Sequence, residues 1–445
     1  MNKMAVSLRI NASIKDFDFS FDEVLLELVK MFNKGGIVKV VELIFNWISI
    51  ILAQNFESLI LPNLEKCCSN PSFNKHGYTS KTMKTTLGKI KVTPQRLRCK
   101  HCGKSVNPFN EFFQLKNRTW SYEFEKLALE TIKDQSYRRS SKQLEATGLI
   151  SASKNQIFRM VRKSDFKKQN VVVDQDLKAL MADGTGYKPW HEDSKKELKI
   201  VLGVNNFDQL VPIGAWIRSS WKQIGRELYK RNRKTKKLAP KKLATVLVSD
   251  GDERLIKGLK KLTHHQQRCQ WHVARNFKYP FQYQDKGSKE DARVYTNQIW
   301  ELLNSTNFNK IQFDEDMSID ERKLKVMEEV WKAEKEINEL EVTLKKDKFS
   351  KAATYLKNAK EQLFTNVRYL IKTGEELPKV TSRIERFMRE LARRMKRIAH
   401  NWSEEGAEIM ARILLQLTLN KKGWDKYWNN KMKLTGNFKC LMTLG

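Results

Sequence analysis

The sequence predicts an α+β protein of several domains, in which a mixed α/β core is interrupted by an all-helical insertion. Short apolar runs of strand length, separated by turn residues and helical patterns, occupy about 175–285 and predict the core. A long charged segment at about 289–400 has helical periodicity and a single proline, Pro378, and it predicts the insertion. A chain of 445 residues is long enough for roughly two to four domains.

Changes of pattern along the chain predict six segments. They are an N-terminal helical segment (1–63), a zinc-ribbon-like β segment (64–118), a segment of three short helices (119–170), the first part of the core (171–288), the all-helical insertion (289–400) and the C-terminal part of the core (401–445). Within the core we predict strands from Leu177 through Asp183 and over 198–204, 210–216 and 243–248, with helices from Trp221 and over 252–262.

The most apolar stretch runs from Ile37 to Leu61. It is interrupted by polar and charged residues, namely Glu42, Asn46, Gln54 and Glu57. It therefore falls short of the uncharged run of about 18 residues that is typical of a membrane-spanning helix. We predict an amphipathic helix that packs on a partner.

The chain is strongly basic. It carries 84 Lys and Arg against 51 Asp and Glu, a formal net charge of +33 at pH 7. Such a charge attracts polyanions, and double-stranded DNA is the partner that we predict. A ribosome-associated or nonspecifically adhesive protein would be equally basic, but it would not need the acidic motifs described below. The run 226–242 has nine basic residues in seventeen and is either a solvated loop or a phosphate-contacting arm.

The cysteines point to metal binding. The N-terminus lacks the basic, apolar and small-residue pattern of a secretion signal, so we expect an intracellular protein, in the cytoplasm and associated with the nucleoid. In that compartment six cysteines are more often metal ligands or core residues than disulfides. Cys99 and Cys102 form a C-x-x-C knuckle, a common spacing in zinc sites. Cys67 and Cys68 supply a candidate second pair, about thirty residues upstream.

The second pair departs from the zinc-ribbon pattern, because its two cysteines are adjacent. Neighbouring cysteines bind one tetrahedral ion poorly. One of the two is then a ligand together with His76, or both are ligands, or the ribbon folds without metal. A hairpin-like stretch at 84–92 lies between the two pairs, as in a zinc ribbon.

Residues 127–163 predict three short helices that resemble a helix-turn-helix. The second spans 140–147 and is ended by Gly148, and the turn is 149–151. In the third helix, Ile157, Met160 and Val161 are predicted to face the core. The opposite face carries polar and basic residues that could read base edges and contact phosphates: Lys154, Asn155, Gln156, Arg159 and Arg162. Trihelical units that bind no DNA are also common.

Three acidic motifs, far apart in the sequence, predict one nuclease centre. Asp183 and Asp250 each lie at or near the end of a predicted strand, and 401–408 is an acidic helix start with Glu405 and Glu408. Carboxylates are the hard oxygen ligands that Mg²⁺ prefers. Two such ions held by carboxylates can stabilise the attacking and the leaving oxygen of a phosphodiester displacement. Taken singly, each acid could instead belong to a turn, a loop or a helix N-terminus.

Four motifs in a fixed order give the chain a family resemblance. They are Asp183-Gly184, Ser249-Asp250-Gly251, Arg268-Cys269-Gln270-Trp271-His272-Val273-Ala274-Arg275-Asn276, and Trp402-Ser403-Glu404-Glu405-Gly406-Ala407-Glu408. Three strands, a helix and two further strands, with acids at the first and fourth strands, is the order of a ribonuclease H-like sheet. The chain resembles the DDE transposases of bacterial insertion sequences, in the Mutator-related branch with a C-x-x-H motif and an all-helical insertion. The resemblance covers roughly 64–430.

The resemblance implies a transposase that cleaves DNA at element ends and joins a strand to target DNA, as an oligomer on DNA. Asp183 and Asp250 match the first two acids of the triad, and Glu408 is predicted as the third, with Glu405 as the alternative. All three would be Mg²⁺ ligands. Cys269 and His272 match the C-x-x-H motif and would orient a strand end or DNA. A transposase-derived DNA-binding protein without catalysis and a structure-specific nuclease are the alternatives.

A basic stretch precedes the predicted third acid. It contains six arginines, Arg383, Arg386, Arg389, Arg393, Arg394 and Arg397. The stretch is either one face of a solvated helix or a clamp for DNA beside the site.

Overall fold

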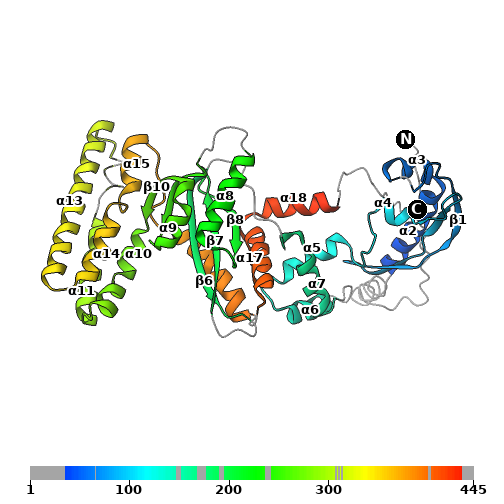
Figure 1. The fold of residues 1–445 in the computed structure, drawn as a ribbon, viewed down its shortest axis with the longest axis horizontal. Helices are drawn as coiled ribbons and strands as arrows, with labels where there is room; N and C mark the ends of the chain where they lie inside the picture. Colours follow the sequence, from blue (N-terminus) through cyan, green and yellow to red (C-terminus); the bar gives the residue numbers. More distant parts are fainter. Residues whose placement is uncertain are drawn as a thin grey trace, which may run out of the picture. The chain divides into compact units, whose positions relative to one another are not determined.

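The chain folds into two units in the computed structural model (Figure 1). The first unit comprises the chain up to Val161 together with the residues from Lys422, and the second comprises Arg162–Lys421. The structure describes residues 36–65, 67–146, 152–167, 177–189, 195–235, 242–305, 308, 311, 314–398 and 402–432. The first 35 residues, the predicted turn at 149–151 and the centre of the basic run 226–242 lie outside these ranges.

The first unit contains a small β structure. Strands β1 (Phe73–Tyr78), β4 (Gln95–Cys99) and β5 (Ser105–Val106) form an antiparallel sheet. Strands β2 (Lys81–Thr85) and β3 (Gly88–Val92) form the hairpin that the sequence predicted at 84–92. The short helices α3 (Phe56–Leu59) and α4 (Pro108–Phe112) complete this part. Its core joins Phe56, Ile90, Leu97 and Phe109.

Helix α2 (Ile37–Gln54) packs on this β structure, as predicted for an amphipathic helix. Its Leu52 and Ala53 are buried, and Glu42 and Asn46 accept hydrogen bonds of 2.7 and 2.8 Å from the backbone N–H groups of Lys91 and Thr93. By length and composition α2 is also apolar enough to cross a membrane, with a mean hydropathy of 1.7. The polar residues that interrupt the apolar run therefore dock the helix on β3 and the turn after it.

Three helices follow in the predicted helix-turn-helix region: α5 (Tyr122–Thr131), α6 (Tyr137–Ala146) and α7 (Lys154–Lys163). The helix α18 (Lys421–Met432) contacts α5, because Asp425 pairs with Lys126 at 2.7 Å and Trp424 donates a 2.8 Å hydrogen bond to Glu130. The predicted segment 401–445 is therefore divided between the two units.

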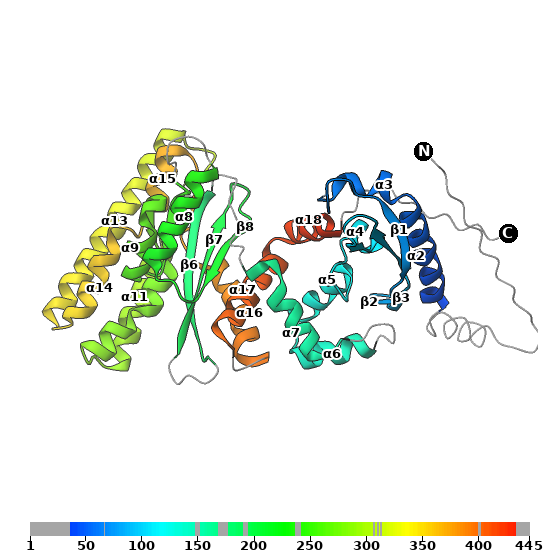
Figure 2. The same ribbon diagram turned by 45° about the vertical axis from the view of Figure 1, so that its right-hand side comes forward.

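The second unit is built on a five-stranded mixed sheet of order β10-β9-β6-β7-β8 (Figure 2). Its strands are β6 (Leu177–Tyr187), β7 (Lys196–Val204), β8 (Leu210–Trp216), β9 (Ala244–Ser249) and β10 (Thr263–Arg268). The pairs β6–β7 and β7–β8 are antiparallel, whereas β6–β9 and β9–β10 are parallel. This is the sequence-predicted arrangement of three consecutive strands, a helix and two further strands.

Helices cover the sheet. The helices α8 (Trp221–Thr235) and α9 (Glu253–Leu259) pack on β6 through Ile224 and Leu259, which share a core with Leu180 and Ala182. Since side chains alternate along a strand, Asp183 points to the opposite face. There the helices α16 (Ser382–Ala392) and α17 (Glu404–Leu419) lie against β6 and β8 (Figure 2).

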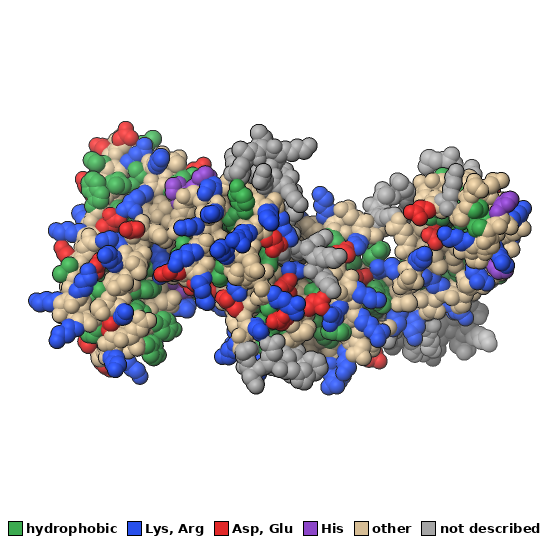
Figure 3. All heavy atoms as spheres, in the orientation of Figure 1, with side chains coloured by type: hydrophobic (Ala, Val, Ile, Leu, Met, Phe, Trp, Pro, Cys, Tyr) green, Lys and Arg blue, Asp and Glu red, His purple; other side chains and the backbone are tan. Residues whose placement is uncertain are grey.

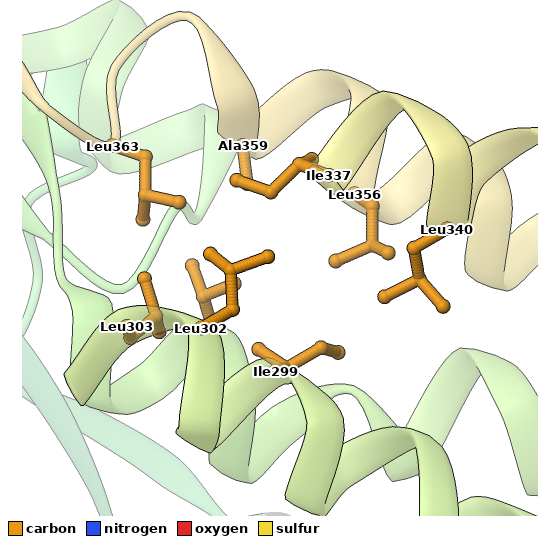
Figure 4. A pocket seen from close by; sticks show the side chains of 9 residues that line it. Ile299, Leu302, Leu303, Ile337, Leu340, Leu356, Ala359 and Leu363 are labelled. Carbon is orange, nitrogen blue, oxygen red and sulfur yellow. The ribbon is translucent and has the colours of Figure 1, made fainter. Parts of the chain in front are cut away.

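The predicted insertion is all-helical over its described residues. After α10 (Gln270–Asn276) come α11 (Lys289–Ser305), α13 (Ile319–Lys346), α14 (Ser350–Lys360) and α15 (Thr365–Thr373). A capping box joins Ser318 and Glu321 at the start of the 28-residue α13. Apolar side chains of α11, α13 and α14 face one another around a cavity of about 10 Å³ (Figure 4). That volume is about the least that can hold one water molecule, so these helices form a packed core of their own.

Candidate active site

Asp183 lies on β6, and Asp250 directly follows the neighbouring parallel strand β9. The paired residues of β6 and β9 end with Met181 and Val248, two residues before each aspartate, and the Asp250 carboxylate acts electrostatically on Asp183. Neighbouring strands are about 4.8 Å apart. Both aspartates are on the face of the sheet away from α8 and α9. The register of two strands thus brings together acids that are 67 residues apart (250 minus 183).

The surroundings of Asp183 are acidic. Burial, together with the nearby carboxylates of Asp250, Glu385 and Glu197, raises the pKa of Asp183 to about 6. A 2.7 Å hydrogen bond from the backbone N–H of Gly184 opposes this rise. A group of carboxylates held near one another, in a chain of net charge +33, is a candidate site for a divalent cation.

Glu385 is a further acid near Asp183, and the sequence analysis did not select it. It lies in the first turn of α16, and its Oε1 accepts a 2.9 Å hydrogen bond from Thr381 Oγ1. The same oxygen is 3.7 Å from His272 Nε2. The signal in the sequence was a helix start after Pro378, with Thr381 at the N-cap and an acid four residues later.

Asp250 is followed by Gly251, whose backbone conformation is one that only glycine adopts readily. Gly251 has φ +96°, and a Cβ placed on it would lie 0.6 Å from Arg268 Nη1. The guanidinium of Arg268 is 5.5 Å from the centre of the Tyr355 ring, in a cation–π arrangement. The backbone N–H of Asp252 donates a 3.0 Å hydrogen bond to Asp250. Gly251 therefore lets an arginine lie next to the second acid.

The residues of the C-x-x-H motif lie together beside Glu385. Cys269 is buried, and its Sγ is 3.3 Å from His272 Nδ1. Burial lowers the pKa of His272, and the nearby carboxylates of Glu385 and Asp250 act in the opposite direction. The motif thus contacts the side chains around the acids, as expected for residues that orient a strand end.

Glu408 and Glu405, predicted as the third acid and its alternative, have other partners. Glu408 accepts a 3.0 Å hydrogen bond from the backbone N–H of Ile217 and pairs with Arg412. Glu405 pairs with Arg162. The groups that raise the pKa of Asp183 include Glu385 and Glu197, and neither of these two. Glu385 lies on α16, which packs against β6, and is a further candidate beside Glu408 and Glu405.

The six arginines before α17 do not form one exposed face. Arg386, Arg389 and Arg397 are exposed. Arg394 is buried, with its guanidinium 4.9 Å from the centre of the Trp402 ring. Close to the acids, the exposed Lys396 donates a 3.1 Å hydrogen bond to Thr185, which lies two residues beyond Asp183 and so on the same face of β6. Part of the stretch is structural, and Lys396 is an exposed cation that contacts the strand carrying Asp183.

The first unit brings its four cysteines together. The sulfur atoms of Cys67, Cys68, Cys99 and Cys102 all lie within 4.8 Å of one another. Desolvation and the neighbouring thiols raise the pKa of Cys67 to about 12, whereas the backbone N–H of Cys102 and others lower that of Cys99 to about 6. His76 lies on the exposed part of β1, outside this group. The arrangement favours a four-cysteine site, with both adjacent cysteines included.

Within the described ranges, these cysteines are the one group of ligand atoms this closely spaced. The carboxylates of Asp183, Asp250 and Glu385 interact electrostatically at longer range.

The third helix of the helix-turn-helix region has the predicted core. Ile157, Met160 and Val161 are at most 1% exposed. Of the five predicted DNA-contacting residues, Lys154, Asn155 and Arg159 are exposed. Gln156 instead accepts a 2.8 Å hydrogen bond from Lys84 of β2, and Arg162 pairs with Glu405. Lys and Arg side chains are spread widely over the visible face of the molecule (Figure 3).

The five-stranded sheet and the acids at its central strands define the class of protein. It is an α/β protein with an acidic centre suited to a divalent cation. No protein-family model matches the chain, and no curated protein matches it. Among solved structures it is similar to a Drosophila P element transposase strand transfer complex, with a TM-score of 0.39 and 10% sequence identity. The alignment covers 68% of this chain and 95% of that chain. A similarity of this size carries no argument about function.

Proposed function

We propose that the protein is a DDE-type transposase that cleaves DNA at the ends of a mobile element and transfers the new end into target DNA. The observation that carries the proposal is that Asp250, directly after β9, and Glu385, on the helix that packs against β6, both act electrostatically on Asp183 of β6. The ordered sequence motifs support it independently. The third acid that we propose is Glu385, in place of Glu408.

The donor set fits Mg²⁺. Asp183, Asp250 and Glu385 would hold the ion, since all three offer hard carboxylate oxygens. When bound, Mg²⁺ activates the attacking oxygen and stabilises the leaving oxygen of a phosphodiester displacement. The raised pKa of Asp183 has the same origin, because burial and neighbouring carboxylates disfavour its negative charge until a cation compensates it.

Basic side chains near the acids would bind the DNA backbone. Lys396 lies beside Thr185, and Arg268 lies against Gly251, so each is next to the strand end that carries one aspartate. Both would hold a phosphate in reach of the acids and leave the base sequence unread.

The first unit would recognise the element ends. The exposed Lys154, Asn155 and Arg159 of α7 are the residues available for base and phosphate contacts, and the four cysteines would hold a structural Zn²⁺. Transposition joins two DNA ends, so we propose a homo-oligomer on double-stranded DNA.

The test is Mg²⁺-dependent nicking and joining of a supercoiled plasmid that carries the DNA flanking the gene. Wild type is compared with Asp183→Asn, Asp250→Asn, Glu385→Gln and Glu408→Gln. We expect the first three variants to bind DNA normally and to lose activity, by more than the roughly 10–100-fold that outer-shell partners of a metal contribute. Glu408→Gln should keep Mg²⁺-dependent activity.

Three other results would each change the proposal. Binding without any cleavage in Mg²⁺ or Mn²⁺ would identify a DNA-binding protein that has lost catalysis. Cleavage without joining of pre-cut ends would identify a structure-specific nuclease. Loss of catalysis in Glu408→Gln with full activity in Glu385→Gln would restore Glu408 as the third acid.

A further inference from the structure

The C-x-x-H motif connects the two elements that carry Asp250 and Glu385. The backbone N–H of Cys269 donates a 2.8 Å hydrogen bond to the carbonyl of Ser249, the residue before Asp250. The Sγ of Cys269 accepts a 3.3 Å hydrogen bond from the backbone N–H of Thr381, at the start of α16. One buried residue thus contacts both the end of β9 and the beginning of the helix that carries Glu385.

The hydroxyl of Thr381 is the centre of this network. Its Oγ1 lies 2.9 Å from Glu385 Oε1, 3.1 Å from His272 Nδ1 and 3.3 Å from Cys269 Sγ. A hydroxyl has one proton to donate, and a carboxylate is a strong, acceptor-only group. The Thr381 proton therefore goes to Glu385, and His272 Nδ1–H donates to Thr381 Oγ1. This assigns the Nδ1-protonated form to a neutral His272.

Two helices begin in this network, and neither has a hydrogen bond from its N-cap side chain to the helix backbone. Thr381 is the N-cap of α16, but its hydroxyl caps no backbone N–H and contacts Glu385 instead. Cys269 is the N-cap of α10 and also makes no capping hydrogen bond within its own helix. Threonine is a good N-cap residue. Its use for a carboxylate side chain, rather than for the helix backbone, points to a role in orienting that carboxylate.

We propose that Cys269, His272 and Thr381 are positioning residues that hold the Glu385 carboxylate toward Asp183 and Asp250. Thr381 fixes the carboxylate oxygen by its hydrogen bond. His272 fixes the direction of the Thr381 hydroxyl through Nδ1, which lies 3.1 Å from Thr381 Oγ1. Cys269 fixes the start of α16 relative to the end of β9. The inference rests on the proposed function only in so far as Glu385 binds metal.

The deciding variants are Thr381→Val, which keeps the shape and removes the hydroxyl, and Thr381→Ser, which keeps the hydroxyl. Thr354→Val is the matched control, because the Thr354 hydroxyl bonds only to the carbonyl of Ser350 among the contacts described and lies in the insertion. For each full-length protein we would determine the crystal structure, Mn²⁺ affinity by electron paramagnetic resonance, DNA affinity, and the Mg²⁺ concentration for half-maximal nicking.

Thr381→Val should displace the Glu385 carboxylate and weaken Mn²⁺ binding roughly 10–100-fold, as is typical of outer-shell partners. It should raise the Mg²⁺ requirement and leave DNA affinity unchanged. Thr381→Ser should restore the wild-type values, and Thr354→Val should match wild type. If Glu385 keeps its position in Thr381→Val and Mn²⁺ affinity is unchanged, the inference is wrong.

A second pair of variants tests the inference should Thr381→Val fail to fold. His272→Asn can place an amide N–H near the position of Nδ1, whereas His272→Leu cannot. We expect His272→Asn to keep the Glu385 position and the Mn²⁺ affinity, and His272→Leu to lose both. Equal Mn²⁺ affinity in these two variants would contradict the inference. If wild type shows no metal-dependent cleavage, the proposed function fails, yet the position of Glu385 in these variants still decides the inference.

Discussion

Asp183 and Asp250 come near each other because Met181 of β6 pairs with Val248 of the parallel strand β9, two residues before each aspartate. A shift of one residue in this register would turn one of the two acids to the α8 and α9 face of the sheet. The apolar residues that precede each aspartate therefore fix the geometry of the candidate site.

Glu408 is predicted to stabilise the fold, in contrast to Glu385. Glu408→Gln leaves Arg412, whose side chain is 8% exposed, without its carboxylate partner. We expect the free energy of unfolding to fall by about 2 kcal/mol, the range for hydrogen bonds to charged groups. Urea titration measures this. Glu404→Gln is the control and should cost less than about 1 kcal/mol, because its partner Arg218 is 75% exposed. Equal effects would show that burial of Arg412 is unimportant.

The raised pKa of Asp183 predicts a pH-dependent stability in the metal-free protein. The pKa rises from an ordinary 3.8 to about 6, so the folded state binds the proton more tightly than the unfolded state. The stability from this group is present below pH 3.8 and is lost as pH rises through about 6. The side chain of the Asp183→Asn variant does not ionise, so this variant does not lose stability as pH rises. It should be more stable than wild type above pH 6, by at most about 3 kcal/mol.

Denaturant titrations in EDTA at pH 4, 6 and 8 measure the effect of Asp183→Asn. The difference from wild type should be near zero at pH 4 and largest at pH 8. A difference that does not change with pH would show that Asp183 titrates normally.

The four cysteines predict one zinc ion per chain. Cys99→Ser and Cys102→Ser should lose the metal and lower the melting temperature of the first unit, because structural zinc sites contribute folding free energy directly. Plasma mass spectrometry of the purified protein gives the stoichiometry. Cys269→Ser, outside the cluster, should keep the zinc. His76→Ala should also keep it, and loss of zinc in that variant would return His76 to the ligand set.

Gly251 is predicted to tolerate no side chain. Gly251→Ala would combine a positive φ of +96° with a Cβ 0.6 Å from Arg268 Nη1, so the arginine must move away from Asp250. We expect a loss of about 2 kcal/mol, mostly from backbone strain, because the guanidinium at the end of the flexible Arg268 side chain can move aside. Gly374→Ala has φ +77° with no atom within 4 Å of the added Cβ, and should cost about 1 kcal/mol. Thermal melting compares the two variants. Similar losses of stability would show that the contact with Arg268 does not matter.

The exposed face of α7 predicts which residues contact DNA. Lys154→Ala and Arg159→Ala should weaken binding, and each should lower by about one the slope of log affinity against log salt concentration if it contacts a phosphate. Gln156→Ala should leave the slope unchanged, because Gln156 holds Lys84 at 2.8 Å. Fluorescence anisotropy between 50 and about 200 mM salt measures the slopes. An unchanged slope in both basic variants would remove α7 from the interface.

The periodic elements were predictable from the sequence. Strands 198–204 and 210–216 were expected, and the structure has β7 and β8 there. Their short length, β-branched residues and flanking turn residues favour strands over helices. Boundaries were less accurate: the helix expected over 252–262 ends as α9 at Leu259, and a short 3₁₀ turn follows. Helix ends of this kind depend on local hydrogen bonds that a periodic pattern does not encode.

The third acid that we propose, Glu385, could not be found from local pattern. Glu404, Glu405 and Glu408 form a clearer acidic helix start than Glu385, which lies among arginines. What distinguishes Glu385 is tertiary: its contact with His272 and its electrostatic effect on Asp183. The partner of Gln156 was missed for the same reason, since Lys84 is 72 residues away.

The contact of α18 with α5 has a consequence for biosynthesis. The first unit includes α18, which follows every other described element in the chain, so Trp424 and Asp425 reach Glu130 and Lys126 only late in translation. Domains generally fold as they emerge from the ribosome. The five-stranded sheet can therefore assemble on the nascent chain before α18 is made and completes the first unit.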